Sequence, residues 1–413
     1  MNQADHKKTV LLVDDAPANI QVVNSILKDI YKIRIATSGA RALELANATP
    51  PPDLILLDVT MPEMDGYEVC ARLKMAPETR DIPVIFLTGQ TEIEDETRGF
   101  EVGAVDYIHK PFSPAVVKAR VQTHCLLRGI REQLARQLLA IQKELETARQ
   151  IQLSILPAEI PKIEGLDIAA RYVPMSSVAG DFYDFIVVDE KHLGILVADV
   201  SGHGMPAALI ASMLKIALAA QIAHTADPAQ LLLGLNQALC GKFQHHFVTA
   251  AYLFVDMQKR TLTYAGAGHP PLLLWGGTSE GVRDVLENGL FLGKFPQATY
   301  SSLELPLRAG DWGLLYTDGI PETTNCSEIE FGTDRFKQFL NTEQSTSADH
   351  FANRLLEELS NWSAGGSGED LHDDITMVAI RVKGDLKSAQ AAEASQPTRE
   401  LAPEMLKEDS EAA

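Results

Sequence analysis

Residues 53–66 read DLILLDVTMPEMDG, an apolar run that ends in Asp58 and leads into a turn rich in acidic residues, proline and glycine. Further short apolar runs flank it, separated by segments of helical length; these are TVLLVDD (9–15), KIRIAT (32–37), PVIFLTG (83–89) and DYIHK (106–110). Three of the runs are almost continuous Val, Ile and Leu, which is typical of strands buried on both faces. The alternation predicts an α/β domain with a doubly wound, five-stranded parallel sheet.

Charged and hydroxyl side chains follow these predicted strands at the edge where an open parallel sheet binds its ligands. They are Asp14 and Asp15 after the first strand, Asp58 after the third, Thr88 after the fourth and Lys110 after the fifth. Three carboxylates at one edge repel each other, and Mg²⁺, which prefers hard oxygen ligands, relieves that repulsion. Asp58 is central and is the candidate nucleophile for an acyl phosphate. For each residue taken alone, the alternative is ordinary turn chemistry.

These motifs, VDD (13–15), ILLDVTMPEMDG (55–66), LTG (87–89) and KPF (110–112), resemble the receiver domain of two-component response regulators over residues 8–125. The resemblance implies that Asp58 is phosphorylated by a histidine kinase or a phosphotransfer protein. It also implies a Mg²⁺ site and a phosphoryl-responsive switch. The Mg²⁺ ligands would be Asp15, Asp58 and the carbonyl of Thr60, with Asp14 in support. The switch residues would be Thr88, Tyr107 and Lys110.

Residues 126–157 follow a different pattern, in which apolar residues recur at alternating spacings of four and three. The repeat contains Leu134, Leu138, Ile141, Leu145 and Ala148, and Gln152 and Ile155 continue it until Pro157 ends the helix. Such a repeat predicts a coiled-coil linker helix that joins two copies of the chain as a homodimer. The alternative is a surface helix that packs on a neighbouring domain.

Residues 165–383 contain many short β-type runs, such as HLGILVADV (192–200), FVTAAYLFVD (247–256) and ITMVAIRV (375–382). Two helical stretches, 205–223 and 228–242, interrupt them. This mixture predicts an α+β domain whose sheets are covered by helices. The tail, 384–413, is rich in Ala, Glu and Ser and is predicted to be disordered.

Aspartates again stand at the ends of the predicted strands of this second domain. Asp181 lies in GDFYD, Asp199 ends GILVADV, Asp318 ends GLLYTD, and Asp373 and Asp374 precede ITMVAIRV. If the sheets bring these carboxylates together, the expected ligands are two hard metal ions, which can activate a water and stabilise phosphoryl oxygens. For any single Asp-Gly pair, the alternative is a simple turn.

The motifs GDFYD (180–184), ADVSGHG (198–204), GAGHPP (266–271), YTDG (316–319) and HDDIT (372–376) resemble, in this order, metal-dependent serine/threonine protein phosphatases of the bacterial SpoIIE/RsbU type. The resemblance implies an αββα-type sandwich that holds two Mn²⁺ or Mg²⁺ ions. The implied ligands are Asp181, Asp199, Asp318, Asp373 and the carbonyl of Val200, with Asp374 secondary. Ala179 departs mildly from the pattern of the relatives, which often have glycine there.

Two histidines of the second domain need separate interpretations. His203 is a candidate proton donor to the leaving group, although its loop spacing differs from that of the better-known branch of the superfamily. His269, in GAGHPP, is expected to order a turn.

Together the two resemblances imply a response regulator whose output dephosphorylates phosphoserine or phosphothreonine on a partner protein under the control of Asp58. In this family the substrate is usually an anti-sigma-factor antagonist. The linker sequence ELETARQIQLSILP (144–157) resembles the helix that precedes this phosphatase type. The alternative is a non-catalytic adaptor that binds a sigma factor, and the presence of all four acids favours the enzyme.

Charge and composition exclude several other classes. Asp and Glu total 56 against 36 Lys and Arg, for a net charge of −20, which makes nucleic acid a poor partner. The four cysteines form no CxxC pair, which argues against a zinc site and fits a reducing compartment. No signal peptide or membrane span is expected, so we predict a cytoplasmic protein without membrane contact.

Overall fold

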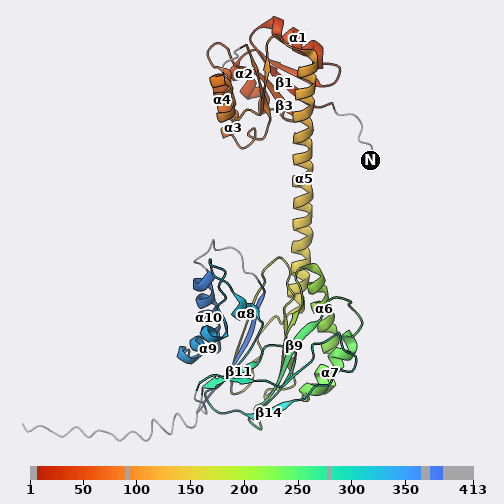
Figure 1. Cartoon of the computed structure of the whole chain (residues 1–413), viewed down its shortest axis with the longest axis vertical. Coiled ribbons are helices and arrows are strands. Elements are labelled where there is room, and N and C mark those ends of the chain that lie inside the picture. Colours follow the sequence, from red (N-terminus) through yellow and green to blue (C-terminus); the bar gives the residue numbers. More distant parts are fainter. Residues whose placement is uncertain (1–6, 90–92, 277–280, 364–372, 385–413) are drawn as a thin grey trace, which may run out of the picture. The chain divides into compact units, whose positions relative to one another are not determined.

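A computed structural model of the chain describes residues 7–89, 93–276, 281–363 and 373–384. The chain divides into two compact units, Met1–Gln142 and Lys143–Ala413 (Figure 1). Helix α5, Pro114–Ile155, runs from the first unit into the second. The tail predicted to be disordered lies outside the described residues, apart from Gly384.

The first unit has the predicted α/β fold, in which five parallel strands follow the order β2-β1-β3-β4-β5. The strands are β1 Thr9–Val13, β2 Lys32–Ala36, β3 Leu54–Asp58, β4 Val84–Thr88 and β5 Asp106–His109. The helices between and after them are α1 Pro17–Leu27, α2 Gly39–Ala46, α3 Gly66–Met75, α4 Ile93–Glu101 and the start of α5. β1, β3 and β4 are buried along their whole length, as their continuous apolar sequences predict.

Helices cover both faces of this sheet because successive strand residues point to opposite sides. Val10 and Leu12 of β1 pack in the core formed with α1 and α5. Leu11 and Val13 pack in the core formed with α2 and α3. The prediction of a doubly wound sheet is therefore confirmed.

The described residues of the second unit form two mainly antiparallel sheets. One follows the order β13-β10-β9-β8-β7, with β14 beside β10, and the other the order β12-β11-β15-β16-β6. The first sheet contains β7 Phe182–Val187, β8 His192–Val200, β9 Val248–Asp256, β10 Thr261–Ala267, β13 Asn288–Gly289 and β14 Leu303–Pro306. The second contains β6 Leu166–Val173, β11 Leu272–Gly276, β12 Arg283–Val285, β15 Asp311–Tyr316 and β16 Ile375–Val382.

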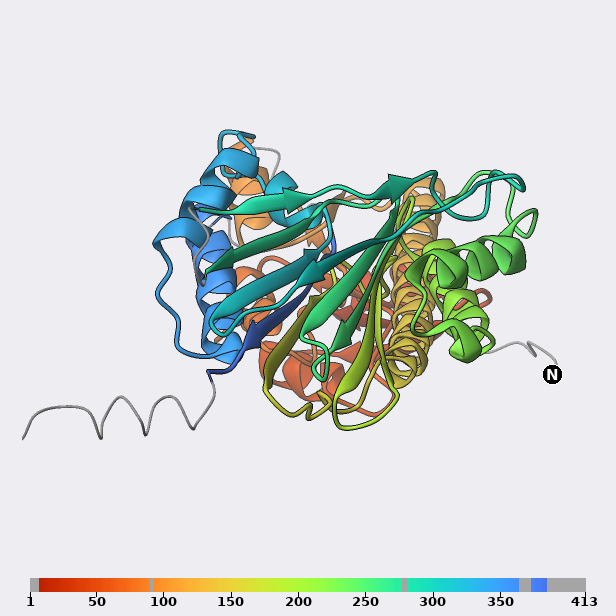
Figure 2. The same cartoon turned by 90° about the horizontal axis from the view of Figure 1, so that it is seen from below.

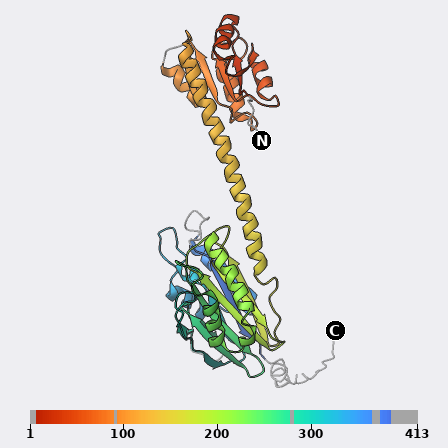
Figure 3. The same cartoon turned by 90° about the vertical axis from the view of Figure 1, so that its right-hand side faces the viewer.

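The two sheets face each other between two layers of helices (Figure 2). Helices α6 Met205–Ala219 and α7 Pro228–Leu239, joined by a short 3-10 helix Ile222–His224, cover the first sheet (Figure 3). Helices α8 Gly319–Glu322, α9 Thr333–Thr342 and α10 Ala348–Ser363 lie on the second sheet. In β8, Leu193, Ile195 and Val197 fill the space between the sheets, and Leu196, Ala198 and Val200 face α6 and α7. The αββα sandwich is thus confirmed, although the sequence predicted only α6 and α7 among its helices.

The observed helix α5 differs from the predicted linker helix, residues 126–157, in two ways. It begins at Pro114 inside the first unit, so the linker is an extension of the last helix of that unit. Leu134, Leu138 and Ile141 are each more than half exposed, as an unpaired coiled-coil stripe would be. Gln152 and Ile155, however, pack inside the second unit, to which they belong, and this corrects their assignment to the coiled-coil stripe. Neither side chain is free to pair with a second helix, because Gln152 binds Ala179 and Ile155 packs against the apolar core that contains α6 and α7.

Within the described residues, no helix combines the length and the apolar character that a membrane crossing requires.

Candidate functional site

The strand ends of the first unit bring the predicted acidic residues together. Oxygens of Asp14, Asp15 and Asp58 lie within 4.8 Å of one another, and Asp14 and Asp58 are buried. Lys110 Nζ lies 2.8 Å from Asp58 Oδ2 and 3.2 Å from Asp14 Oδ2. The backbone N–H of Thr60 donates to Asp58 Oδ1 at 3.4 Å. This donor set of hard oxygens beside one lysine fits a Mg²⁺ ion and a phosphoryl group.

The electrostatics of Asp58 fit a carboxylate that needs a cation. Burial raises its pKa, the Asp14 carboxylate adds to the rise, and the Lys110 ammonium opposes it. Close packing holds the residue in place, because a Cβ on Gly66 would lie 2.2 Å from the Asp58 carbonyl oxygen. A side chain at position 66 would therefore displace the backbone that carries Asp58.

The two other predicted switch residues are Thr88, at the end of β4, and Tyr107, in β5. Thr88 is buried at the last position of β4, one strand away from Asp58. Tyr107 is 4 % exposed, and its ring centroid lies 5.6 Å from that of Phe86 and 5.2 Å from that of Phe100 of α4. Tyr107 therefore lies between the sheet and α4, in contact with both.

In the second unit, each sheet contributes one pair of aspartates. Phe182 pairs with Ala198 in the register of β7 and β8, so the next residues outward, Asp181 and Asp199, are neighbours. Asp318 follows β15 and Asp373 precedes β16, two strands that pair in antiparallel fashion.

Hydrogen bonds join the two sheets at the point where these aspartates meet. The Thr317 hydroxyl donates to Asp181 Oδ2 at 2.8 Å, which links β15 to the start of β7. Asp374 accepts from the backbone N–H groups of Met175 and Gly180, both at 2.7 Å. Asp374, which the sequence placed as secondary, therefore holds the segment that carries Asp181.

Burial and mutual repulsion dominate the electrostatics of this acidic cluster. Burial, and next the Asp199 carboxylate, raise the pKa of Asp181. Burial, and then Asp318 and Asp373, raise the pKa of Asp199 to about 8. Glu322 of α8 also lies close enough that burial and the carboxylates of Asp318 and Asp373 raise its pKa. Glu322 was not among the residues predicted from the sequence, although it lies only four residues after Asp318.

The donor set of the cluster fits divalent metal ions. Among the described ion pairs, none gives Asp181, Asp199, Asp318 or Asp373 a lysine or arginine partner, so no described side-chain cation offsets the repulsion among these carboxylates. Their oxygens are spread more widely than those of the receiver cluster, which alone among the described residues gathers three ligand atoms within 4.8 Å. Carboxylate oxygens are nevertheless the hard ligands that divalent ions such as Mg²⁺ prefer.

The remaining predicted residues have different environments. The carbonyl oxygen of Val200 faces Gly180, since a Cβ there would lie 2.8 Å from it. His203 is exposed in the loop between β8 and α6. His269 is 3 % exposed; its Nδ1 lies 2.8 Å from the Thr249 hydroxyl and its carbonyl accepts from Asn288. These contacts support the expectation that His269 orders its turn.

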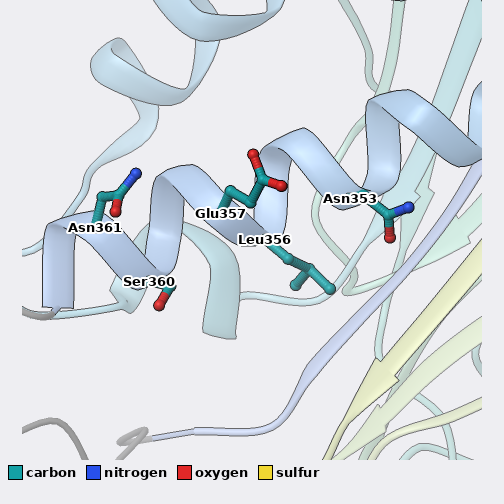
Figure 4. A pocket seen from close by; sticks show the side chains of 5 residues that line it. All are labelled: Asn353, Leu356, Glu357, Ser360 and Asn361. Carbon is teal, nitrogen blue, oxygen red and sulfur yellow. The ribbon is translucent and has the colours of Figure 1, made fainter.

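A shallow depression lies along α10, apart from the aspartates (Figure 4). All the side chains that line it come from this one helix: Asn353, Leu356, Glu357, Ser360 and Asn361. It contains none of the predicted site residues.

Comparisons with known proteins match both units. A family model described as stage II sporulation protein E (SpoIIE) matches residues 189–383, and one described as response regulator receiver domain matches residues 10–122. The phosphoserine phosphatase RsbU of Bacillus subtilis is 31% identical over 263 residues, which cover 63% of this chain and 75% of RsbU. The solved SiaA-PP2C domain of Pseudomonas aeruginosa is 27% identical with a TM-score of 0.53; the match covers 60% of this chain and 99% of that domain.

A third relative shares a smaller region. A probable cyclic di-GMP phosphodiesterase of Vibrio cholerae is 53% identical over 116 residues, which make up 28% of this chain. The chain spans only 26% of the length of that protein.

Proposed function

The chain belongs to the SpoIIE family of protein serine/threonine phosphatases and carries a response regulator receiver domain, and from this we propose that phosphorylation of Asp58 controls its phosphatase activity. The proposed reaction removes phosphate from phosphoserine or phosphothreonine on a partner protein. The observation that carries it is the meeting of Asp181, Asp199, Asp318 and Asp373 at one end of the two sheets.

The proposed chemistry assigns a role to each group of the acidic cluster. The four carboxylates and the carbonyl of Val200 would hold two Mn²⁺ or Mg²⁺ ions. When bound, such ions activate a water and neutralise phosphoryl oxygens. Hydrolysis breaks the bond between phosphorus and the seryl oxygen, and a water oxygen takes the place of the seryl oxygen. The leaving oxygen needs a proton, for which His203 is the candidate donor.

The proposed partners follow from the two domains. The receiver needs a histidine kinase or a phosphotransfer protein as its phosphoryl donor. The proposed substrate is a phosphorylated anti-sigma-factor antagonist. Incubation of the protein with Mn²⁺ and a phosphoserine-labelled antagonist should release inorganic phosphate. A protein that stays inactive on every phosphoprotein, yet binds a sigma factor once Asp58 is phosphorylated, would instead be an adaptor.

Metal binding should stabilise the second domain. A ligand at 100 times its dissociation constant adds about 2.7 kcal/mol to the free energy of unfolding, which corresponds to a rise in Tm of about 5–10 °C. Differential scanning calorimetry with and without Mn²⁺ measures the shift. The double variant Asp199→Asn/Asp318→Asn, whose receiver cluster is intact, should show no shift in the transition of this domain. An equal shift in the double variant would contradict the proposed ligands.

The exposed apolar stripe on α5 supports a homodimer. Burial of such a stripe against a second helix removes apolar surface from water, and this drives coiled-coil formation. Leu138→Asp together with Leu145→Asp should convert the dimer to a monomer, as measured by light scattering. Leu139→Asp, at a still more exposed position outside the repeat, is the control. An unchanged molar mass in the double variant would exclude this interface.

A further inference from the structure

Gln152 of α5 is a buried glutamine on a helix whose other described glutamines lie at the surface. It is 6 % exposed, and both atoms of its side-chain amide bind the same residue of the second domain. Its Nε2 donates to the carbonyl oxygen of Ala179 at 2.6 Å, and its Oε1 accepts from the Ala179 N–H at 3.0 Å. This paired contact fixes one backbone residue in both position and orientation.

The backbone that Gln152 holds leads directly to the acidic cluster. Gly180 donates to Asp374, and Asp181 follows it. A Cβ on Gly180 would lie 2.8 Å from the carbonyl oxygen of Val200 and 3.3 Å from that of Gly202. Because Gly180 packs this closely on the Val200 carbonyl, we expect a displacement of Ala179 to move Asp181 or that carbonyl as well.

Among the described contacts, the end of α5 makes no other hydrogen bond to residues 175–184. Ile155 and the following Leu156 pack against the apolar core beneath α6 and α7, a contact that sets no specific orientation. The hydrogen bonds of Gln152 are directional, so they fix how the last turn of the helix faces Ala179. A rotation of that turn would break them.

We propose that Gln152 is a positioning residue that couples the last turns of α5 to metal binding by Asp181 and Val200. The inference rests on the proposed function, which takes these two residues as ligands. Coupling between two sites is reciprocal, so metal binding should also order the end of α5. Conversely, loss of the Gln152 contact should weaken metal binding although Gln152 is not itself a ligand.

Hydrogen exchange of the full-length protein, followed by mass spectrometry of peptides, tests both directions. In the wild type, Mn²⁺ should slow exchange in residues 145–156 and in residues 175–184. In Gln152→Leu, we expect the Mn²⁺ concentration for half-maximal protection of residues 175–184 to rise about 10-fold, the lower end of the effect of removing a group that binds a metal ligand directly, because Gln152 acts one step further out through Ala179. Residues 145–156 should no longer respond. Excess Mn²⁺ should restore the phosphatase rate.

Gln150→Leu is the matched control, since Gln150 lies on the same helix, is exposed and binds only Glu146 among the described contacts. It should behave as the wild type.

If Gln152→Leu fails to fold, Gln152→Glu tests the same contact, because its carboxylate keeps the acceptor and loses the donor to Ala179. Wild-type metal dependence in a folded Gln152 variant overturns this inference alone. No response to Mn²⁺ in the wild type overturns the proposed metal site and the inference together.

Discussion

Asp318→Asn should lower the rate of phosphoserine hydrolysis by several powers of ten while the protein remains folded. Asparagine keeps the shape of the side chain but removes a negative charge from a site that must hold two cations. The Asp318 side chain makes no capping hydrogen bond to α8, so the substitution removes little local structure. A thousandfold loss corresponds to about 4 kcal/mol of transition-state stabilisation.

The carboxylates should act as a unit. Since removal of one ligand already disrupts the site, Asp199→Asn/Asp318→Asn should be little slower than either single variant. The measurement is release of phosphate from a phosphoserine protein in a titration of Mn²⁺, with folding checked by circular dichroism. Asp284→Asn, which removes a charge from a surface ion pair with Lys337, is the control and should keep the wild-type rate. Full activity in the presence of a chelator would refute the two-metal reaction.

The receiver could be predicted from the sequence almost completely because its signals are local. Each buried strand is a continuous apolar run, and the residues that meet in the site are the first polar residues after those runs. Parallel pairing then places all the carboxyl ends at one edge. Asp14, Asp58 and Lys110 accordingly lie in contact, as predicted.

The helices on the second sheet were missed for a physical reason. α9 and α10 are amphipathic and rich in charged residues, so their helical pattern depends on a few apolar positions. In α10 these are Phe351, Leu355 and Leu359, which recur every four residues and are buried against the sheet. This spacing of four is the signal in the sequence, but it rests on few positions among many charged residues.

The contacts that support the acidic cluster depend on pairings between distant segments. Asp374 reaches Met175 and Gly180 because β16 lies beside β6, a pairing between the two ends of the domain sequence. Gln152 occupies a position that continues a heptad repeat, and nothing local distinguishes a buried glutamine from an exposed one there. Sequence motifs therefore identified the proposed ligands, whereas the structure was needed to find the residues that hold them.

Asp58→Ala should abolish phosphorylation of the receiver by acetyl phosphate or by a cognate kinase. The reaction forms a bond between a carboxylate oxygen of Asp58 and phosphorus and breaks the bond to the leaving group of the donor. No neighbouring carboxylate can substitute for Asp58. Asp14 is held by the backbone N–H of Ala16 and by Asn19 as well as by Lys110, and Asp15 is exposed at the margin of the cluster.

Incorporation of labelled phosphate, together with the intact mass of the protein, measures this effect. Asp58→Asn preserves the size of the side chain and should be equally inactive, which separates loss of the nucleophile from loss of packing. Asp81→Ala, at an exposed position of the same domain, should take up phosphate like the wild type. Acetyl phosphate should change the phosphatase rate of the wild type and of Asp81→Ala but not that of either Asp58 variant. Uptake of label by Asp58→Asn at the wild-type level would show that another residue is the phospho-acceptor, since only an unaltered nucleophile can react at an unaltered rate.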